Sequence, residues 1–227
     1  MAGTTRLKIY NGALELLGSR ELASLSEERK PRRLLDRVWN SSGVRYCLEQ
    51  GEWQFAMRAQ ELDNDPAVET DFGFAYAFNK PTDWVATHAV CSDPYYNQPL
   101  TRYNDETEFL YADITPIYWK YVSDDASFGG DLTKWPQSFC NYVDAYFASK
   151  ICISLTKNKD ILSFLIGQPG KTDGGELGKR LKIAKSRAGM TQPTRFPAQG
   201  GWTRSRQGRG GGRGPLGDGG LPGSLIG

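Results

Sequence analysis

The spacing of hydrophobic positions changes twice along the chain, from helical to alternating and back. From Leu7 to Leu17, apolar residues recur at i, i+3, i+7 and i+10, which places them on one face of a 3.6-residue period. Gly18 follows the last of them and is a typical helix stop. The pattern predicts a first helix over residues 4–18.

A second helix is expected over residues 24–50. Ser24 followed by Glu27 has the spacing of a capping box, and Gly51 ends the apolar periodicity. Pro31 falls close enough to this start to be tolerated in the first turns, although the helix could begin only there.

The middle of the chain alternates with period two and is rich in aromatic residues, as strands are. Strand-like segments cover 53–62, 72–81 and 107–113, with turn clusters between them, and 84–90 fits a strand or a short helix. We interpret residues 53–122 as a small antiparallel β region inserted between helices.

Helical spacing returns at Lys134, and Pro136 is acceptable in a first turn. The apolar pattern predicts helix over 134–167 and a basic helix over 176–189. After residue 190 the composition is dominated by Gly, Arg and Pro, with too little apolar material for a core, so residues 191–227 are expected to be disordered in isolation.

Together these elements predict an α+β protein that is mainly helical: an antiparallel helical bundle with a small inserted antiparallel β region. Residues 1–190 form its single domain, and residues 191–227 form an extended C-terminal tail. The expected bundle core consists of apolar positions from the three longest helices: Leu14, Leu17, Leu35, Val38, Phe139, Tyr142, Val143 and Tyr146.

Charge is distributed unevenly along the 227 residues, although the net charge is only +2. From Gly174 to the end there are ten Lys or Arg and two acids, a net of +8, which leaves −6 for residues 1–173. The chain therefore has an acidic body and a basic end. No apolar run is long enough to span a membrane, and the first residues lack a signal pattern, so neither a membrane partner nor secretion is expected.

The residues that commonly carry catalysis or bind metals are sparse. The four cysteines (47, 91, 140 and 152) lack C-x-x-C spacing and are expected to be buried thiols, and His88 is the only histidine. No nucleophile elbow, P-loop or H-E-x-x-H motif is present. Asp124 and Asp125 could pair as carboxylates but fit a solvated acidic turn better. We expect no catalytic residues, no cofactor, no metal and no enzyme activity.

The Arg/Gly-rich tail leaves three interpretations open: docking on an acidic protein, contact with nucleic acid, or passive flexibility. Its arginine forks suit carboxylates or phosphates, but no RNA-binding module precedes it. We favour protein docking, with cations and spaced apolar anchors as the contact residues: Arg195, Trp202, Arg204, Arg206, Arg209, Arg213, Leu216, Leu221 and Ile226.

A run of aromatic residues in the β region also has two interpretations. Such residues can stack nucleic-acid bases, but on short strands they more often pack a small sheet or a seam between subunits. We favour packing for the whole set: Tyr95, Tyr96, Tyr103, Phe109, Tyr111, Tyr118, Trp119 and Tyr121.

Several blocks of the sequence, in order, resemble the tail tubular protein A and head-to-tail adaptor family of tailed bacteriophages. The resemblance covers about residues 5–160, and the basic helix and the tail lie outside it. It rests on five segments: Leu14-Glu15-Leu16-Leu17-Gly18, Arg37-Val38-Trp39-Asn40, CLEQGEWQFA at 47–56, Pro81-Thr82-Asp83-Trp84-Val85, and the stretch 118–156 with its Trp135-Pro136-x-x-Phe139 helix start.

The resemblance implies a structural subunit of the virion, assembled in the host cytoplasm. Twelve copies would form a ring beneath the portal protein and join the capsid to the tail nozzle and fibre proteins. Genomic DNA would pass through the ring without sequence-specific contact, and an acidic wall would keep it from sticking. The competing hypothesis is a nucleic-acid-binding protein that uses the Arg/Gly-rich tail.

Overall fold

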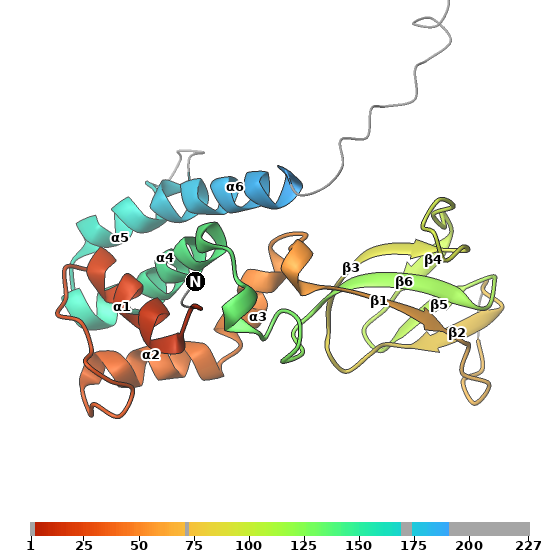
Figure 1. Cartoon of the computed structure of the whole chain (residues 1–227), viewed down its shortest axis with the longest axis horizontal. Coiled ribbons are helices and arrows are strands. Elements are labelled where there is room, and N and C mark those ends of the chain that lie inside the picture. Colours follow the sequence, from red (N-terminus) through yellow and green to blue (C-terminus); the bar gives the residue numbers. More distant parts are fainter. Residues whose placement is uncertain (1–2, 71–72, 169–173, 191–227) are drawn as a thin grey trace, which may run out of the picture. The chain divides into compact units, whose positions relative to one another are not determined.

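The computed structural model describes residues 3–70, 73–168 and 174–190. The chain divides into two units between Thr191 and Gln192, and everything described here belongs to the first. The described residues form six α-helices and two three-stranded antiparallel sheets, with 44% of residues helical and 18% in strands (Figure 1). The expectation of a mainly helical bundle is therefore wrong, because the strands build a second structural layer with its own core.

The helix α1 (Arg6–Leu16) begins at Thr5, whose hydroxyl accepts a hydrogen bond from the Lys8 amide at 3.3 Å. It ends where Gly18 adopts a φ of 62°, a left-handed conformation that glycine enters without strain. The first helix is thus slightly shorter than the 4–18 expected.

The single helix expected over 24–50 is two helices, α2 (Lys30–Asn40) and α3 (Gly43–Glu49). The chain breaks at Ser42, which has a φ of 64°. At Gly43 a Cβ would lie 2.6 Å from the Val38 carbonyl oxygen, so this tight turn needs glycine. The side chain of Glu27 accepts a hydrogen bond from the Ala23 amide, but α2 begins only beside Pro31.

The strands form two sheets rather than one small insertion. The first has the order β1-β6-β3 and the second β2-β5-β4, and all pairings are antiparallel. The strand bounds are β1 (Met57–Leu62), β2 (Tyr76–Asn79), β3 (Trp84–Cys91), β4 (Tyr103–Asp105), β5 (Phe109–Ala112) and β6 (Ile117–Ser123). A separate buried cluster lies between the two sheets, formed by Phe78, Val90, Leu110, Ala112, Ile117, Trp119 and Tyr121.

The segment expected as helix 134–167 also divides, into α4 (Gln137–Thr156) and α5 (Lys159–Ile166). Lys157 has a φ of 54° and ends α4, and the Asn158 side chain then caps α5 by accepting a hydrogen bond from the Asp160 amide at 2.8 Å. The basic helix is α6 (Gly175–Met190).

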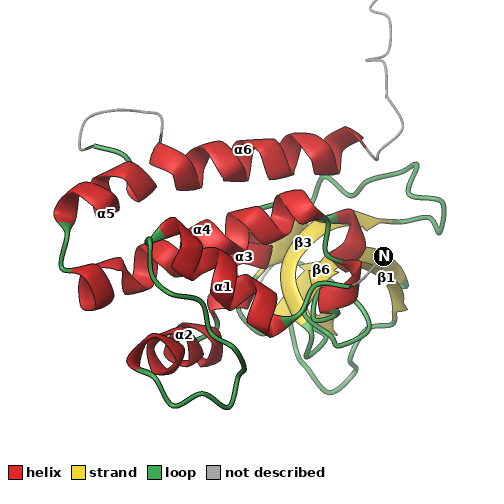
Figure 2. Cartoon of the chain, turned by 60° about the vertical axis from the view of Figure 1, so that its left-hand side comes forward, coloured by secondary structure: helices red, strands yellow, loops and turns green. Residues whose placement is uncertain are grey.

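The helix α4 is the centre of the helical part. It packs against α1, α2, α5 and α6 (Figure 2), and eleven of its 20 residues are buried. Of the expected core positions, Val38 is partly buried and packs against the core. The others lie fully within it: Leu14, Leu17, Leu35, Phe139, Tyr142, Val143 and Tyr146.

Candidate functional site

Four aromatic side chains form a joint between the helical part and the first sheet. We call Trp53, Phe55, Trp135 and Phe139 the aromatic joint. The Phe139 ring lies at its centre, 4.7 Å from Trp53, 4.9 Å from Phe55 and 4.9 Å from Trp135, measured between ring centroids. Aromatic pairs at these distances stabilise a core beyond their buried area, by about 0.5–1.5 kcal/mol per pair.

Both indole nitrogens of the joint donate to backbone carbonyls. Trp135 Nε1 donates to the Gly129 oxygen at 2.9 Å, and Trp53 Nε1 donates to the Leu48 oxygen at 3.0 Å. Gly129 has no room for a side chain, because a Cβ would lie 2.2 Å from the Ser123 carbonyl oxygen. The joint therefore connects the loop after β6 with the C-terminal end of α3 and the start of α4.

A buried polar network on Asp83 stands next to the joint. The Asp83 carboxylate accepts hydrogen bonds from Arg58 at 2.9 Å, from Tyr121 at 3.2 Å and from the Ser123 hydroxyl. Burial alone would raise the pKa of Asp83, but the hydrogen bonds from Ser123 and Arg58 outweigh it and lower the pKa. Burial raises the pKa of Tyr121, and the Asp83 charge adds to this. The network locks the turn at 81–85 onto β1 and β6.

Three of the five sequence blocks that carry the family resemblance contribute to one buried cluster, through Trp53, Val85 and Phe139. The segment 47–56, the turn at 81–85 and the Trp135–Phe139 helix start come from three distant parts of the chain. Arg45, in α3 just ahead of the first of them, donates to both the Asp124 carboxylate and the Trp84 carbonyl. Their shared role is to connect the helices to the sheets.

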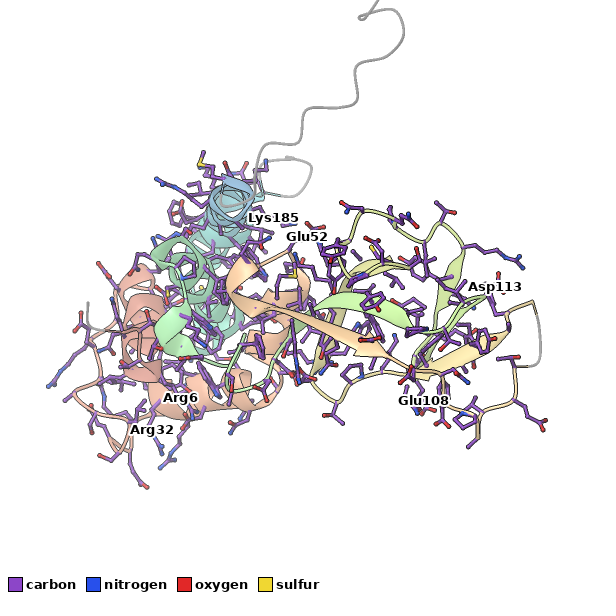
Figure 3. All side chains as sticks on the ribbon, turned by 45° about the vertical axis from the view of Figure 1, so that its right-hand side comes forward. Arg6, Arg32, Glu52, Glu108, Asp113 and Lys185 are labelled. Atoms are coloured by element: carbon purple, nitrogen blue, oxygen red, sulfur yellow. The ribbon has the colours of Figure 1, made fainter. Side chains whose placement is uncertain are left out.

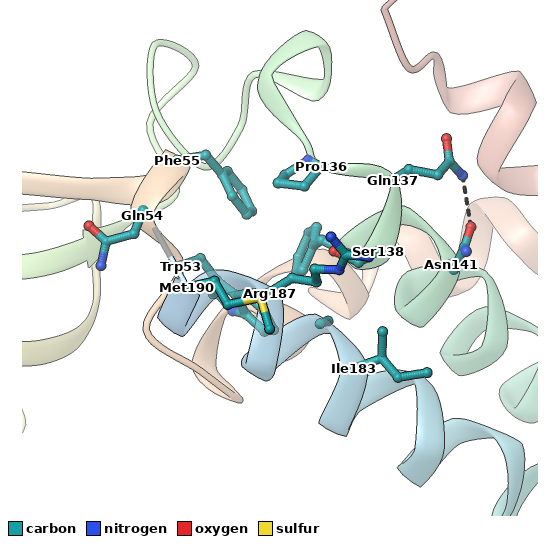
Figure 4. Close-up of a pocket in the computed structure, with 13 residues that line it drawn as sticks. Trp53, Gln54, Phe55, Pro136, Gln137, Ser138, Asn141, Ile183, Arg187 and Met190 are labelled. Carbon is teal, nitrogen blue, oxygen red and sulfur yellow. Dashed lines mark hydrogen bonds between the residues drawn. The ribbon is translucent and has the colours of Figure 1, made fainter. Parts of the chain in front are cut away.

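A groove of about 600 Å³ opens beside the aromatic joint, against α6 (Figure 4). The helix contributes Ile183, Arg187 and Met190, and the exposed fractions of Ile183 and Met190 are 56% and 73%. The opposite wall is mainly apolar and consists of Trp53, Phe55, Pro136 and Phe139, with Gln54, Gln137, Ser138 and Asn141 at the edges. The solvent-exposed apolar side chains at this groove are those of Pro136, Ile183 and Met190, whereas Trp53 and Phe139 are buried beneath it.

Asp144 is a buried acid in the middle of α4. Its Oδ1 is inaccessible and has no hydrogen-bond partner, and its Oδ2 occupies the space opposite Gly12 of α1. Burial raises its pKa to about 7, and the charges of Arg180 and Lys8 limit the rise. This acid stands within the apolar segment NYVDAYFAS, a sequence signal for a buried titratable group that the pattern analysis passed over.

The other acids and the histidine considered from the sequence are dispersed. Asp124 pairs with Arg45, and the side chain of Asp125 caps the turn by accepting from the Ser127 amide at 2.8 Å. His88 Nδ1 lies 3.2 Å from a Glu52 carboxylate oxygen, without hydrogen-bonding geometry.

All four cysteines are buried, and burial raises the pKa of Cys47 and of Cys140. Among residues 3–70, 73–168 and 174–190, no group of three or more potential metal ligands was found. No helix in that part of the chain is long and apolar enough to cross a membrane.

The aromatic run of the β region divides by location. Trp119 and Tyr121 are buried in the core between the sheets, whereas Tyr95 is 80% exposed and Tyr103 is 38% exposed. The exposed rings were not distinguishable from the buried ones by sequence spacing. The expected docking residues of the tail lie outside the described residues: Arg195, Trp202, Arg204, Arg206, Arg209, Arg213, Leu216, Leu221 and Ile226.

Charge also separates by element. Residues 57–123, which include both sheets, carry four Lys or Arg and eleven acids, whereas α6 carries five Lys or Arg and one acid. Figure 3 labels Lys185 on α6, and Glu108 and Asp113 immediately before and after β5. The acidic body expected from the sequence is thus concentrated in the β region.

No protein-family model matches the chain, and no curated protein matches it.

Proposed function

We propose that this chain is a structural head-to-tail adaptor subunit of a tailed bacteriophage. In this account twelve copies form a ring beneath the portal protein, the ring contacts the tail nozzle and fibre proteins, and genomic DNA passes through it. The protein acts through its surfaces in the virion and carries out no chemistry.

The observation that supports the proposal most is that two of the resembling segments pack against each other in the aromatic joint. Here the 47–56 segment and the Trp135–Phe139 helix start pack ring against ring. The turn at 81–85 is locked in place next to them through Asp83.

The architecture also suits a ring subunit. The helices packed around α4 and the two sheets have separate cores, so the subunit can present distinct surfaces to its neighbours in a ring and to other partners. The excess of acids in residues 57–123 suits a surface past which DNA moves, because like charge prevents phosphates from sticking.

The direct test is to mix the purified protein with portal rings of its own phage and to image the product by negative-stain electron microscopy. The proposal expects a second ring on one face of the portal. Portals that remain bare at saturating protein would overturn it.

Nucleic-acid binding is the second candidate, and the five cations of α6 are the observation that favours it. A protein that neutralises several phosphates loses affinity steeply with salt. Tight binding to duplex DNA or RNA with such a slope would support this candidate, and weak binding that varies little with salt would exclude it.

A further inference from the structure

The groove beside α6 has a charged and apolar rim on one face of the helix. Lys179, Ile183, Arg187 and Met190 are spaced at i, i+4, i+8 and i+11, which places them along one side of α6. We call these four residues the α6 stripe. All four are exposed, and three of them line the groove. Ala184, on the buried side of the helix, also lines the groove.

The loop that follows β3 in the first sheet carries an exposed aromatic side chain and an acid, which complement the apolar and basic residues of the α6 stripe. Tyr95 is 80% exposed, the highest value among the large apolar side chains described. The loop that presents it is held in one shape, because Asp93 Oδ1 accepts hydrogen bonds from the amides of Asn97 at 3.1 Å and Gln98 at 2.8 Å.

The next residue in this loop, Tyr96, has a φ of 57°. A left-handed conformation costs a residue other than glycine about 1–2 kcal/mol. Such strain is often retained at functional sites. The loop therefore has a defined conformation, and it holds the Tyr95 side chain at the surface, outside the core of this chain.

Two carboxylates stand at this end of the first sheet: Asp93 in the loop itself, and Glu61 on β1, which is separated from β3 by β6. Tyr118 of β6 donates to Glu61 of β1 at 3.2 Å, and Tyr118 pairs across the sheet with Cys91, just before the loop. Burial and the hydrogen bond to Glu61 raise the pKa of Tyr118, and the charges of Glu61, Asp63 and Asp93 add to this rise. We call Tyr95 and these three acids the Tyr95 patch.

We propose that the groove beside α6 is the docking site for the Tyr95 patch of a second copy of this chain. The Tyr95 ring of one copy enters the apolar groove of the next. The acids of the patch face Lys179 and Arg187 of the α6 stripe. Tyrosine and arginine are enriched at the centres of protein interfaces, so this pairing has the usual composition of a contact.

The two surfaces are different patches on the same chain, so the contact between copies is head-to-tail. Contacts of this kind generate rings when the rotation closes. The inference rests on the proposed function, for which it names the surfaces through which neighbouring subunits meet. Complementary charge fixes the register of the contact and speeds encounter.

The experiment joins carboxylates to lysines with a zero-length carbodiimide cross-linker. Equal amounts of ¹⁴N- and ¹⁵N-labelled protein are mixed, cross-linked at low salt, digested and analysed by mass spectrometry. We expect isotopically mixed peptides that join Lys179 to Glu61, Asp63 or Asp93. The protein concentration is raised until the cross-linking yield no longer increases. If no such mixed peptide is found at that concentration, the proposal is overturned.

Charge reversal tests the same contact by sedimentation velocity. Lys179→Glu with Arg187→Glu, and separately Glu61→Lys with Asp63→Lys, should each weaken self-association about tenfold or more. A 1:1 mixture of the two variants should recover it, because each then meets a complementary partner. Tyr95→Ser should weaken association without altering the melting temperature, since the side chain is exposed.

Matched controls stand on the same elements. Lys182→Glu with Lys185→Glu makes the same change at two exposed α6 lysines that do not line the groove, and Glu106→Lys with Glu108→Lys makes it on the β4–β5 turn. Both should associate like the wild type. Equal loss in a control and in its test variant would show a general charge effect and overturn the inference.

Two further results separate the hypotheses. If the α6 stripe variant loses duplex DNA binding while self-association is unchanged, the stripe serves nucleic acid and the inference is wrong. If that variant still forms complete rings on the portal, the inference fails while the proposed function stands. Cross-links between copies without any ring on the portal would support the contact and reject the adaptor function.

Discussion

Asp144 gives this fold an unusual response to pH at the scale of a single residue. Its pKa in the folded protein is about 7, against 3.8 in an unfolded chain. The folded state therefore binds its proton more tightly, and the stability that this contributes is complete below about pH 4 and is lost as pH rises to about 7. The loss is about 4 kcal/mol at most.

Asp144→Asn should remove this dependence. The variant should be more stable than the wild type at pH 8, and the difference should vanish toward pH 4. Urea unfolding of both proteins at several pH values checks this, because the difference between them cancels the other carboxylates. A difference that stays constant from pH 4 to pH 8 would show that Asp144 does not titrate in this range.

Gly12 is the structural counterpart of Asp144. A Cβ at Gly12 would lie 2.4 Å from the Asp144 Oδ2. Gly12→Ala should therefore destabilise the protein by about 1–3 kcal/mol, as overpacking does. In an Asp144→Ala background the same change should become stabilising by about 0.5–1 kcal/mol, because alanine is the better helix former. Equal effects in the two backgrounds, measured by urea unfolding, would disprove the coupling.

At the scale of elements, the sequence predicted the approximate positions of the helices better than the breaks that divide them. The breaks at Ser42 and Lys157 depend on left-handed backbone in residues other than glycine, which no local signal announced. The strand β4 was also missed, because its three exposed residues have no apolar alternation. The division into two sheets arises from pairing between distant strands, such as β3 with β6, which periodicity does not determine.

The candidate site was predictable only in part. The aromatic joint was visible as segments, since Trp53, Phe55 and the Trp135–Phe139 helix start were all recognised from the sequence. Their contact was not, because it brings together residues about 80 positions apart. The groove and the Tyr95 patch could not be predicted, because they depend on which side of a helix or loop faces solvent. Sequence spacing alone does not distinguish the exposed Tyr95 from the buried Trp119.

Phe139 tests the importance of the aromatic joint. It is fully buried and contacts three other rings, so Phe139→Ala should lower stability by about 3–5 kcal/mol. The helical part should unfold before the sheets are affected. Phe164→Ala is the control, because that ring is 58% exposed on α5 and its loss should change stability by less than about 0.5 kcal/mol. Thermal unfolding followed by circular dichroism compares them, and equal melting temperatures would place Phe139 outside the stabilising core.

At the scale of the whole molecule, we propose that residues 191–227 dock on the portal or on an adjacent subunit. Ordering a segment costs about 1–2 kcal/mol per residue of backbone, so attachment requires many contacts along its length. Deleting residues 191–227 should leave the melting temperature unchanged and weaken or abolish stable attachment to the portal. Infectious, DNA-retaining particles at wild-type levels with the truncated protein would disprove this role.

The central claim is that this chain is a ring subunit assembled on a portal template, and counting copies tests it most directly. Mass photometry of the protein alone should detect monomers or small oligomers, since rings formed without the portal would be unproductive. With portal present, the mass should increase by twelve subunits in one step, without stable partial rings. Stable rings of another copy number on the portal, or no increase in mass at saturating protein, would contradict the account.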